Sequence, residues 1–268
     1  MKPYKALTIA GSDSGGGAGI QADLKTFQEL NVFGMSALTA ITAQNTLGVQ
    51  GVYPLSIEAV IQQIDSIADD IGTDAVKTGM LFSSEIIIAV SYKVMEYKWE
   101  NLVVDPVMVA KGGSTLLKSE AVQALKKHLL PLAKVVTPNI PEAEILTDMS
   151  IHTLDDRKEA AKKINSLGAK YVIMKGGHDE KTDTIVDLLY DGEQFVPMES
   201  NRINTQHTHG TGCTFAAAVT AELAKGHNIY EAARVAKEFI HAAIENELGI
   251  GSGHGPTNHW AYRKKNEA

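Results

Sequence analysis

Near its start the chain reads Ala6-Leu7-Thr8-Ile9-Ala10-Gly11-Ser12-Asp13-Ser14-Gly15-Gly16-Gly17-Ala18-Gly19-Ile20. The first five residues are an apolar run of strand length, and an amphipathic helical pattern begins at Ile20. Glycines between them let the backbone approach a ligand closely, with Ser12, Asp13 and Asp23 as polar candidates. The alternative is a flexible surface turn. The stretch predicts a strand, a ligand-binding loop and a helix in that order.

The same alternation of short apolar runs and longer amphipathic runs continues along the chain. It predicts strands over 6–10, 35–43, 75–78, 102–104, 135–137, 171–175 and 184–190. It predicts helices over 20–30, 57–71, 84–97, 119–130, 154–167, 214–225 and 229–248. Several strands are continuous Val/Ile/Leu runs, which is typical of parallel strands buried on both faces. The pattern indicates a layered βαβ fold, and without linkers or repeats we expect a single domain over residues 1–268.

Composition narrows the classes of partner. The 268 residues include one cysteine, which excludes an intrachain disulfide and favours a reducing cytoplasm. A formal net charge of −7 argues against broad binding to nucleic acid or to anionic membranes. No run approaches the ~20 apolar residues that a membrane span needs. An acidic chain that binds phosphates must therefore use local devices such as helix N-termini, glycine loops, a lysine or Mg²⁺.

The most informative motif is Thr208-His209-Gly210-Thr211-Gly212-Cys213-Thr214-Phe215, directly before a helical run. Two glycines expose consecutive N–H groups, and with the helix dipole they make a site for anions. The same field is expected to lower the pKa of Cys213 and favour a thiolate. The alternative is a tight turn with a small buried cysteine.

Polar residues also follow three later strands. Asp105 ends an apolar strand and could hold Mg²⁺, or simply cap the next helix. Asn139 and Glu142 have the spacing of a capping box, which does not exclude a second role in orienting Mg²⁺ and phosphate. Lys175, followed by two glycines, suits a phosphate counter-charge, or is a solvated lysine at a strand end.

Several familiar enzyme classes do not fit. The glycines after the first strand match neither G-x-G-x-x-G nor a Walker A motif, which counts against a Rossmann dehydrogenase and a P-loop kinase. The histidines at 178, 207, 209, 254 and 259 lack a compact metal-ligand spacing and offer little. No G-x-S-x-G elbow is present, so an α/β-hydrolase is disfavoured.

Taken together, the chain resembles the hydroxymethylpyrimidine and phosphomethylpyrimidine kinases of thiamine biosynthesis, within the ribokinase-like superfamily. The segments AGSDSGGGAGIQADLKTF, TAQNT, KTGML, VVDPVMVAKGG, TPNIPEAE, MKGGH and HGTGCTF occur in the order found in that family, over roughly Ala6 to His259. The resemblance implies a three-layer α/β/α sandwich around a mostly parallel sheet. It also implies two successive phosphorylations by ATP, of a hydroxymethyl group and then of its monophosphate.

The resemblance assigns roles to residues in four sets. The catalytic set is Cys213, Gly210, Thr211, Gly212 and Lys175, with Cys213 where other ribokinase-like enzymes have an aspartate base. The substrate-binding set is Gln44, Gly11, Asp23, Ala18, Gly79, Met80 and Val107. The ATP-binding set is Asn139, Lys175, Gly176, Gly177, Thr211 and Gly212, and the Mg²⁺ set is Asp105 and Glu142.

Gln44 is the expected substrate selector, because an amide both donates and accepts and can pair with an aminopyrimidine edge. Thr42 differs from the apolar residue often found near this pocket in the family. A pyridoxal or pyridoxine kinase is the first alternative, and a non-catalytic protein that binds a vitamin precursor is the second. We expect a homodimer, as is ordinary for the superfamily, and either 14–19 or 111–114 as the loop that closes over the ligand.

Overall fold

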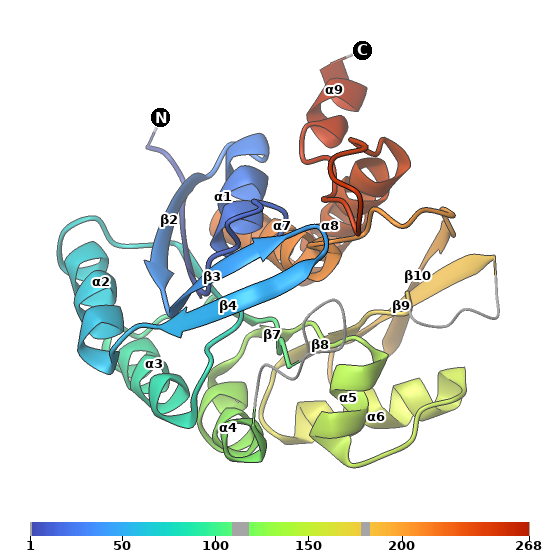
Figure 1. Ribbon diagram of the computed structural model, residues 1–268. Helices are drawn as coiled ribbons and strands as arrows, with labels where there is room; N and C mark the ends of the chain where they lie inside the picture. The colour runs from blue at the N-terminus through green and yellow to red at the C-terminus, as the bar shows by residue number, and fades with distance from the viewer. Residues whose placement is uncertain (1, 109–117, 178–182, 268) are drawn as a thin grey trace.

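The computed structural model describes residues 2–108, 118–177 and 183–267. Among these residues, eight strands form one sheet in the order β10-β9-β8-β7-β6-β5-β1-β2, and β3 and β4 form a separate small sheet (Figure 1). The strands are β1 Lys5–Ala10, β2 Phe33–Leu38, β3 Ala40–Asn45, β4 Gly48–Pro54, β5 Ala75–Thr78, β6 Leu102–Val104, β7 Val135–Val136, β8 Tyr171–Met174, β9 Thr184–Tyr190 and β10 Phe195–Asn201.

The helices separate into two layers. They are α1 Gly19–Glu29, α2 Ile57–Asp70, α3 Ser84–Glu96, α4 Ser119–Ala124, α5 Ile140–Thr147, α6 Leu154–Ser166, α7 Thr211–Ala224, α8 Ile229–Glu245 and α9 Ala261–Glu267. One apolar core joins the sheet to α2 through α6, and the other joins it to α1, α7 and α8. Successive strand residues take opposite sides: Val103 belongs to the second core, whereas Leu102 and Val104 belong to the first. The three-layer α/β/α sandwich is therefore confirmed.

The strand pairing places the loops that carry polar residues at one edge of the sheet. β2, β1, β5, β6, β7 and β8 pair in parallel, whereas β9 and β10 are antiparallel additions at one side. The segments that follow β1, β5, β6, β7 and β8 consequently leave the sheet at the same end. Parallel α/β sheets bind ligands at this end.

Two expected elements are interrupted in the structure. The strand predicted over 35–43 divides at Thr39 into β2 and β3, which belong to different sheets. Thr39 is buried, its N–H donates to Ala10 O at 3.1 Å and its hydroxyl donates to Met80 O at 2.7 Å, so the chain turns out of the main sheet there. The helix predicted over 119–130 is α4 followed by a π-helical segment, Leu125–Leu129, and a 3₁₀ turn at Pro131.

Other elements were absent from the prediction. β4 contains two glycines, and β10 contains Pro197, so neither has a strong strand pattern. β10 is an edge strand, where a proline can be accommodated. Two predicted helices differ only in extent: the helix that the capping box of Asn139 and Glu142 opens is the short α5, and α7 begins at Thr211, three residues earlier than expected.

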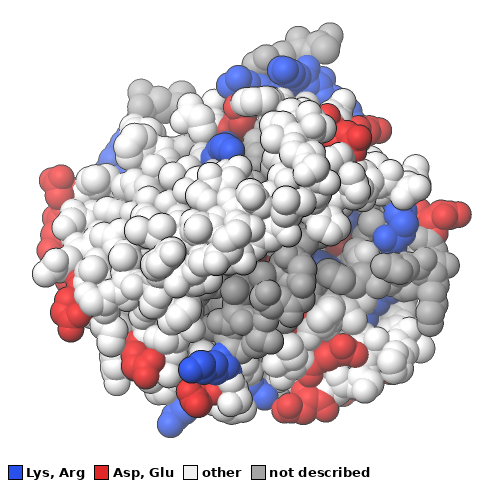
Figure 2. Space-filling model, viewed as in Figure 1, with Lys and Arg blue, Asp and Glu red and all other residues white. Residues whose placement is uncertain are grey.

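The small sheet crosses the face of the molecule above the carboxyl edge (Figure 1). In the space-filling view of the same face, the band over β3 and β4 carries no charge, and charged side chains gather mainly around the margin (Figure 2). Ile41, Leu47 and Tyr53 on this sheet and its turn are 48%, 71% and 62% exposed. None of the helices in the described ranges combines the length and apolar character needed to cross a membrane.

Candidate active site

A cavity of about 470 Å³ lies at the carboxyl edge of the main sheet. It is lined by residues that follow successive strands and by Gln44 of β3. The predicted residues that line it are Gly11, Ala18, Gln44, Gly79, Met80, Asp105, Val107, Asn139, Glu142, Lys175, Gly210, Thr211, Gly212 and Cys213. The structure thus brings together most of the residues that the sequence singled out, from nearly the whole length of the chain.

The anion site predicted at the start of α7 has the required backbone. Gly210 is the N-cap residue with φ of 83°, a left-handed conformation that favours glycine. A Cβ at Gly210 would overlap the carbonyl oxygen of Gly17, so the glycine-rich loop packs directly on this turn. A Cβ at Gly212 would lie 3.2 Å from Lys175 Nζ. The start of α7 and the lysine therefore face the same position.

Lys175 forms an ion pair beside this position. Its Nζ lies 3.0 Å from Asp105 Oδ1, and the side chains are 13% and 2% exposed. The Thr137 hydroxyl donates to the same Asp105 oxygen at 3.3 Å. Burial alone would lower the pKa of Lys175, but the carboxylates of Asp105 and Glu142 more than offset it and raise the pKa. The lysine is thus a charged ammonium at the cavity wall.

The predicted capping box at the start of α5 is confirmed. Glu142 N donates to Asn139 Oδ1 at 2.9 Å, and Asn139 N donates to Glu142 Oε2 at 2.8 Å. Burial and the nearby Asp105 carboxylate raise the pKa of Glu142 to about 7, although Lys175 acts in the opposite direction. Glu142 therefore caps α5 and lines the cavity at the same time.

The expectation of a lowered pKa at Cys213 is wrong. Burial of the thiol raises its pKa to about 12, with Asp23 and Asp105 adding to the rise and Lys77 opposing it. Cys213 is therefore a thiol, and its conversion to a thiolate requires a change in the charge around it.

Asp23 is the substrate-set residue that does not line the cavity. Its carboxylate is fully buried, accepts from the Thr8 hydroxyl at 2.6 Å and pairs with Lys77 Nζ at 2.9 Å. Lys77 is also fully buried, and a Cβ at Gly79 would lie 3.2 Å from its Nζ. The predicted direct contact of Asp23 with substrate is replaced by a sealed ion pair beneath the cavity. Sequence reasoning missed Lys77, although it begins the KTGML segment.

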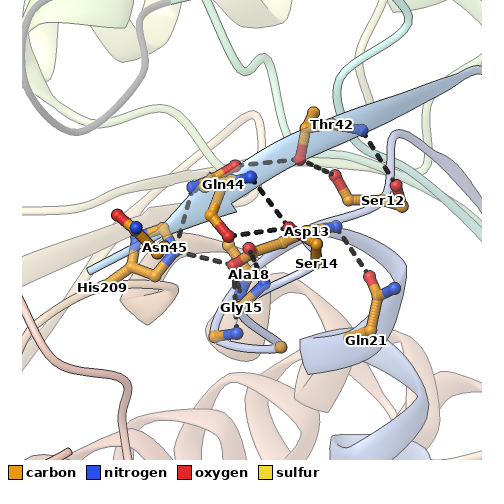
Figure 3. A network of polar contacts seen from close by, with 12 residues as sticks. Ser12, Asp13, Ser14, Gly15, Ala18, Gln21, Thr42, Gln44, Asn45 and His209 are labelled. Carbon is orange, nitrogen blue, oxygen red and sulfur yellow. Dashed lines mark hydrogen bonds and ion pairs between the residues drawn. The ribbon is translucent and has the colours of Figure 1, made fainter. Parts of the chain in front are cut away.

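The glycine-rich loop is organised around Asp13 (Figure 3). Its Oδ1 accepts from Gly15 N at 2.8 Å, and its Oδ2 accepts from Gly17 N at 3.0 Å and Ala18 N at 2.8 Å. The same Oδ2 lies 2.8 Å from Nε2 of His209, which the sequence analysis had set aside. The signal for His209 was its place next to Gly210-Thr211-Gly212, and not any spacing to another histidine.

A second cavity, of about 690 Å³, adjoins the first. The two share Asn139, Lys175, Thr208, Thr211 and Gly212. Gly177 also lines the second cavity, whereas Gly176 lines neither and donates its N–H to Asp187 Oδ1 at 2.7 Å. The remainder of its wall mixes polar groups with apolar side chains such as Phe215, Ile240 and Ile244. Two ligands could therefore meet at Lys175 and the start of α7.

The predicted metal ligands and one predicted loop can now be located relative to the cavity. In the part of the chain that the structure describes, no three His, Cys, Asp or Glu side chains gather closely enough to hold a metal ion by themselves. Asp105 and Glu142 do share the cavity, as predicted for a pair of Mg²⁺ ligands. The candidate loop at 111–114 lies outside the described residues.

Known proteins match this chain over nearly all of its length. The sequence profile of the family described as phosphomethylpyrimidine kinase matches residues 13–258. A hydroxymethylpyrimidine/phosphomethylpyrimidine kinase from Bacillus subtilis is 60% identical over 98% of this chain and 97% of its own. A pyridoxine kinase from the same organism is 52% identical over 98% of both chains. The crystal structure of an ADP complex of Bacillus subtilis pyridoxal kinase superposes with a TM-score of 0.92 at 52% identity, covering 98% of this chain and 99% of that one.

Proposed function

This chain belongs to the phosphomethylpyrimidine kinase family, and on that premise we propose the reaction that it catalyses. It transfers a phosphoryl group from ATP to the hydroxymethyl group of 4-amino-5-hydroxymethyl-2-methylpyrimidine, and then transfers a second one to the monophosphate. The product is the pyrimidine diphosphate used in thiamine biosynthesis. The observation that carries the proposal is the pair of adjoining cavities that meet at Lys175 and the N-terminus of α7.

The larger cavity suits the nucleotide and the smaller one suits the pyrimidine. Gly177, Asn139 and the apolar side chains of α8 line the former, whereas Gln44, Met80 and Val107 line the latter. The transferring phosphoryl group would lie at the shared wall, where the amides of Gly210 to Cys213 and the Lys175 ammonium can stabilise its charge. Phosphoryl transfer depends mainly on such positioning and charge compensation.

Mg²⁺ fits the two carboxylates of the first cavity, which lie beside Lys175 of the shared wall. Asp105 and Glu142 both line the first cavity, and burial together with the Asp105 carboxylate raises the pKa of Glu142, so a cation beside the two carboxylates would be favourable. Phosphate oxygens and water would complete the coordination, as is usual for this ion. Bound there, Mg²⁺ would supply charge compensation for the phosphates of ATP.

Cys213 is the group placed to accept the proton of the substrate hydroxyl. Burial raises the pKa of the Cys213 thiol and disfavours this step, and added positive charge at the shared wall would favour the thiolate. The second phosphorylation starts from an ionised phosphate and needs little proton abstraction. Cys213 should therefore matter more in the first step than in the second.

Phosphorylation of pyridoxal or pyridoxine is the second candidate activity. It is favoured by the 52% identity with a pyridoxine kinase from Bacillus subtilis. These rings also carry a hydroxymethyl group, so the two activities can share one site. The presence of Gln44 in the cavity favours the pyrimidine as the preferred substrate.

Steady-state kinetics with Mg-ATP test the proposal, using the pyrimidine alcohol, its monophosphate and pyridoxal as acceptors. We expect both pyrimidine substrates to be turned over, with kcat/KM at least tenfold above that for pyridoxal. A preference for pyridoxal would replace the substrate assignment and leave the kinase chemistry. Absence of turnover with all three would refute the proposal.

We also propose that the chain acts as a homodimer in the cytoplasm. The uncharged band over β3 and β4, with Ile41, Leu47 and Tyr53 exposed, is a surface that a second copy could cover. The single cysteine is consistent with a reducing compartment. Sedimentation equilibrium of the wild type and of a Leu47→Glu/Tyr53→Glu variant tests the assembly.

A further inference from the structure

The amide of Gln44 lies between two side chains that constrain which way it points (Figure 3). As drawn, the amide nitrogen Nε2 lies 3.2 Å from Nε2 of His209, and the amide oxygen Oε1 lies 3.3 Å from Oγ1 of Thr42. The oxygen and nitrogen of a carboxamide have nearly the same shape, so their hydrogen-bond partners determine which is which. The hydrogen bonds of His209 and those of Thr42 each determine the orientation of the Gln44 amide independently.

His209 must present a proton at Nε2. This nitrogen lies 2.8 Å from Oδ2 of Asp13. Burial alone would raise the pKa of Asp13, but hydrogen bonds and charge from His209 and the N–H groups of Ala18 and Gly15 hold it below its usual value. An ionised carboxylate only accepts, so His209 Nε2 is a donor. The protonated Nε2 has no free lone pair and cannot accept from an NH₂ group, whereas the amide oxygen can share its proton with Asp13. The end of the Gln44 amide that faces His209 is therefore the oxygen.

Thr42 leads to the same orientation from the opposite end. Its hydroxyl has one proton, which it donates to Ser12 O at 2.8 Å. The hydroxyl oxygen can still accept, so the end of Gln44 that faces it must be the NH₂ group. Thr42 is buried and its N–H donates to Ser12 Oγ at 3.1 Å, which holds the residue in place.

We propose that His209, oriented by Asp13, and Thr42 are positioning residues that hold the Gln44 amide with its oxygen toward His209 and its nitrogen toward Thr42. One oxygen lone pair and one N–H then remain for a ligand. An aminopyrimidine offers an amino donor next to a ring-nitrogen acceptor, which matches that pair in one register only. A pyridoxal ring lacks such a pair. This inference rests on the proposed function and concerns how the site discriminates between the two rings.

The proposal explains why residues outside the direct substrate set should control specificity. If His209 lost its donor, the amide could rotate and present the wrong register to the aminopyrimidine. Pyridoxal makes no matching pair, so it would be affected much less. A merely structural role of His209 would instead weaken both substrates together.

The test is a cycle of substitutions read as the ratio of kcat/KM for the pyrimidine alcohol to that for pyridoxal. His209→Leu and Thr42→Val should each lower the ratio about tenfold, the effect of one misplaced hydrogen bond. Thr42→Ser is the matched control because it keeps the hydroxyl, and it should retain the wild-type ratio. In a Gln44→Leu background, neither His209→Leu nor Thr42→Val should change the ratio.

Calorimetric Kd values for the two rings provide the readout that does not need turnover. The same pattern in Kd supports the inference even if the chemical step is slow in a variant. Equal loss of both rings in His209→Leu, or an unchanged effect after Gln44→Leu, would overturn it. If the wild type phosphorylates neither ring, the proposed function fails, and the Kd values still decide the positioning of Gln44.

Discussion

Two lysine–carboxylate pairs lie near the carboxyl edge of the sheet, and they differ in their exposure to the cavity. Lys77 Nζ lies 2.9 Å from Asp23, and Lys175 Nζ lies 3.0 Å from Asp105. The first pair is completely sealed, whereas the Lys175 side chain is 13% exposed in the cavity wall. A lysine–carboxylate pair therefore has a structural role in one place and a role at the cavity in the other. A sealed pair cannot exchange its partners, and an open pair can turn toward a phosphate or a cation.

The helices that cover each pair explain the difference. Asp23 is on α1, which packs against α7 over β1 and β5, so the pair is enclosed by the layer of α1 and α7. Lys175 follows β8, and Gly212, which has no side chain, leaves space in front of it. Both pairs act electrostatically on Cys213, because Lys77, Asp23 and Asp105 all shift its pKa. Substitutions can disrupt either pair separately.

Breaking the sealed pair should have the largest effect. Lys77→Met leaves the buried Asp23 carboxylate without its cation and should lower the free energy of unfolding by about 3–5 kcal/mol. Urea unfolding measures this change. The matched double variant Asp23→Asn/Lys77→Met leaves no unpaired charge and should be more stable than the single variant. A loss below about 1 kcal/mol in Lys77→Met would contradict the account.

Breaking the open pair should affect turnover more than folding. Lys175→Met removes charge from the shared wall of the two cavities and should lower kcat/KM about hundredfold. Its free energy of unfolding should change less than that of Lys77→Met, because Lys175 already reaches the cavity. Urea unfolding and kinetics of both variants distinguish a pair that stabilises the fold from a pair that acts in catalysis. A drop of less than about tenfold in kcat/KM would argue against that separation.

Cys213→Ala should divide the two phosphorylations. We expect the rate of the first step to fall by at least about a hundredfold, the lower range for loss of a general base. The second step should fall at least tenfold less, because its acceptor is already ionised. Single-turnover rates from the alcohol and from the monophosphate measure both steps. Cys213→Ser is the control for shape, and equal losses in the two steps would contradict the assigned role.

The pKa of Cys213 can be read directly, since it is the only cysteine in the chain. With a pKa of about 12, the thiolate fraction should rise about tenfold for each pH unit throughout the accessible range. Iodoacetamide labelling of the unliganded protein between pH 7 and 10 should therefore show no plateau. A plateau near pH 8 would show that the N-terminus of α7 outweighs burial after all.

The smallest expected effect is at Glu142. Its pKa of about 7 lies above the unfolded value of 4.5, so the folded state binds more protons between these values and stability falls as pH rises through that window. Glu142→Gln keeps the capping box but has no charge to lose. Its Tm relative to wild type should be higher at pH 8 than at pH 5. Equal differences at both pH values would contradict the raised pKa.

Features of the site that depend on local sequence patterns were predictable. Gly11, Asp105, Asn139 and Lys175 follow apolar strands, and parallel strands carry such residues to one edge, so their meeting in one cavity was predictable. The capping box of α5 was readable from a four-residue spacing.

Properties that depend on distant contacts were not predictable. Asp13 and His209 are 196 residues apart, and no spacing rule connects them. Asp23 was expected in the cavity because it closely follows the glycine-rich loop, but its side chain pairs with the buried Lys77. The pKa of Cys213 was misjudged because burial, which the sequence does not show, opposes the helix N-terminus. The break at Thr39 likewise depends on acceptors at Ala10 and Met80.

The most direct test of the account is ³¹P NMR of one reaction that contains the protein, Mg-ATP and the pyrimidine alcohol. The account predicts that a phosphomonoester signal appears first and is then replaced by diphosphate signals, as ATP is converted to ADP. Pyridoxal in a parallel reaction should yield monoester only, and more slowly. ATP left unchanged with the pyrimidine, or pyridoxal consumed faster than the pyrimidine, would contradict the central claim.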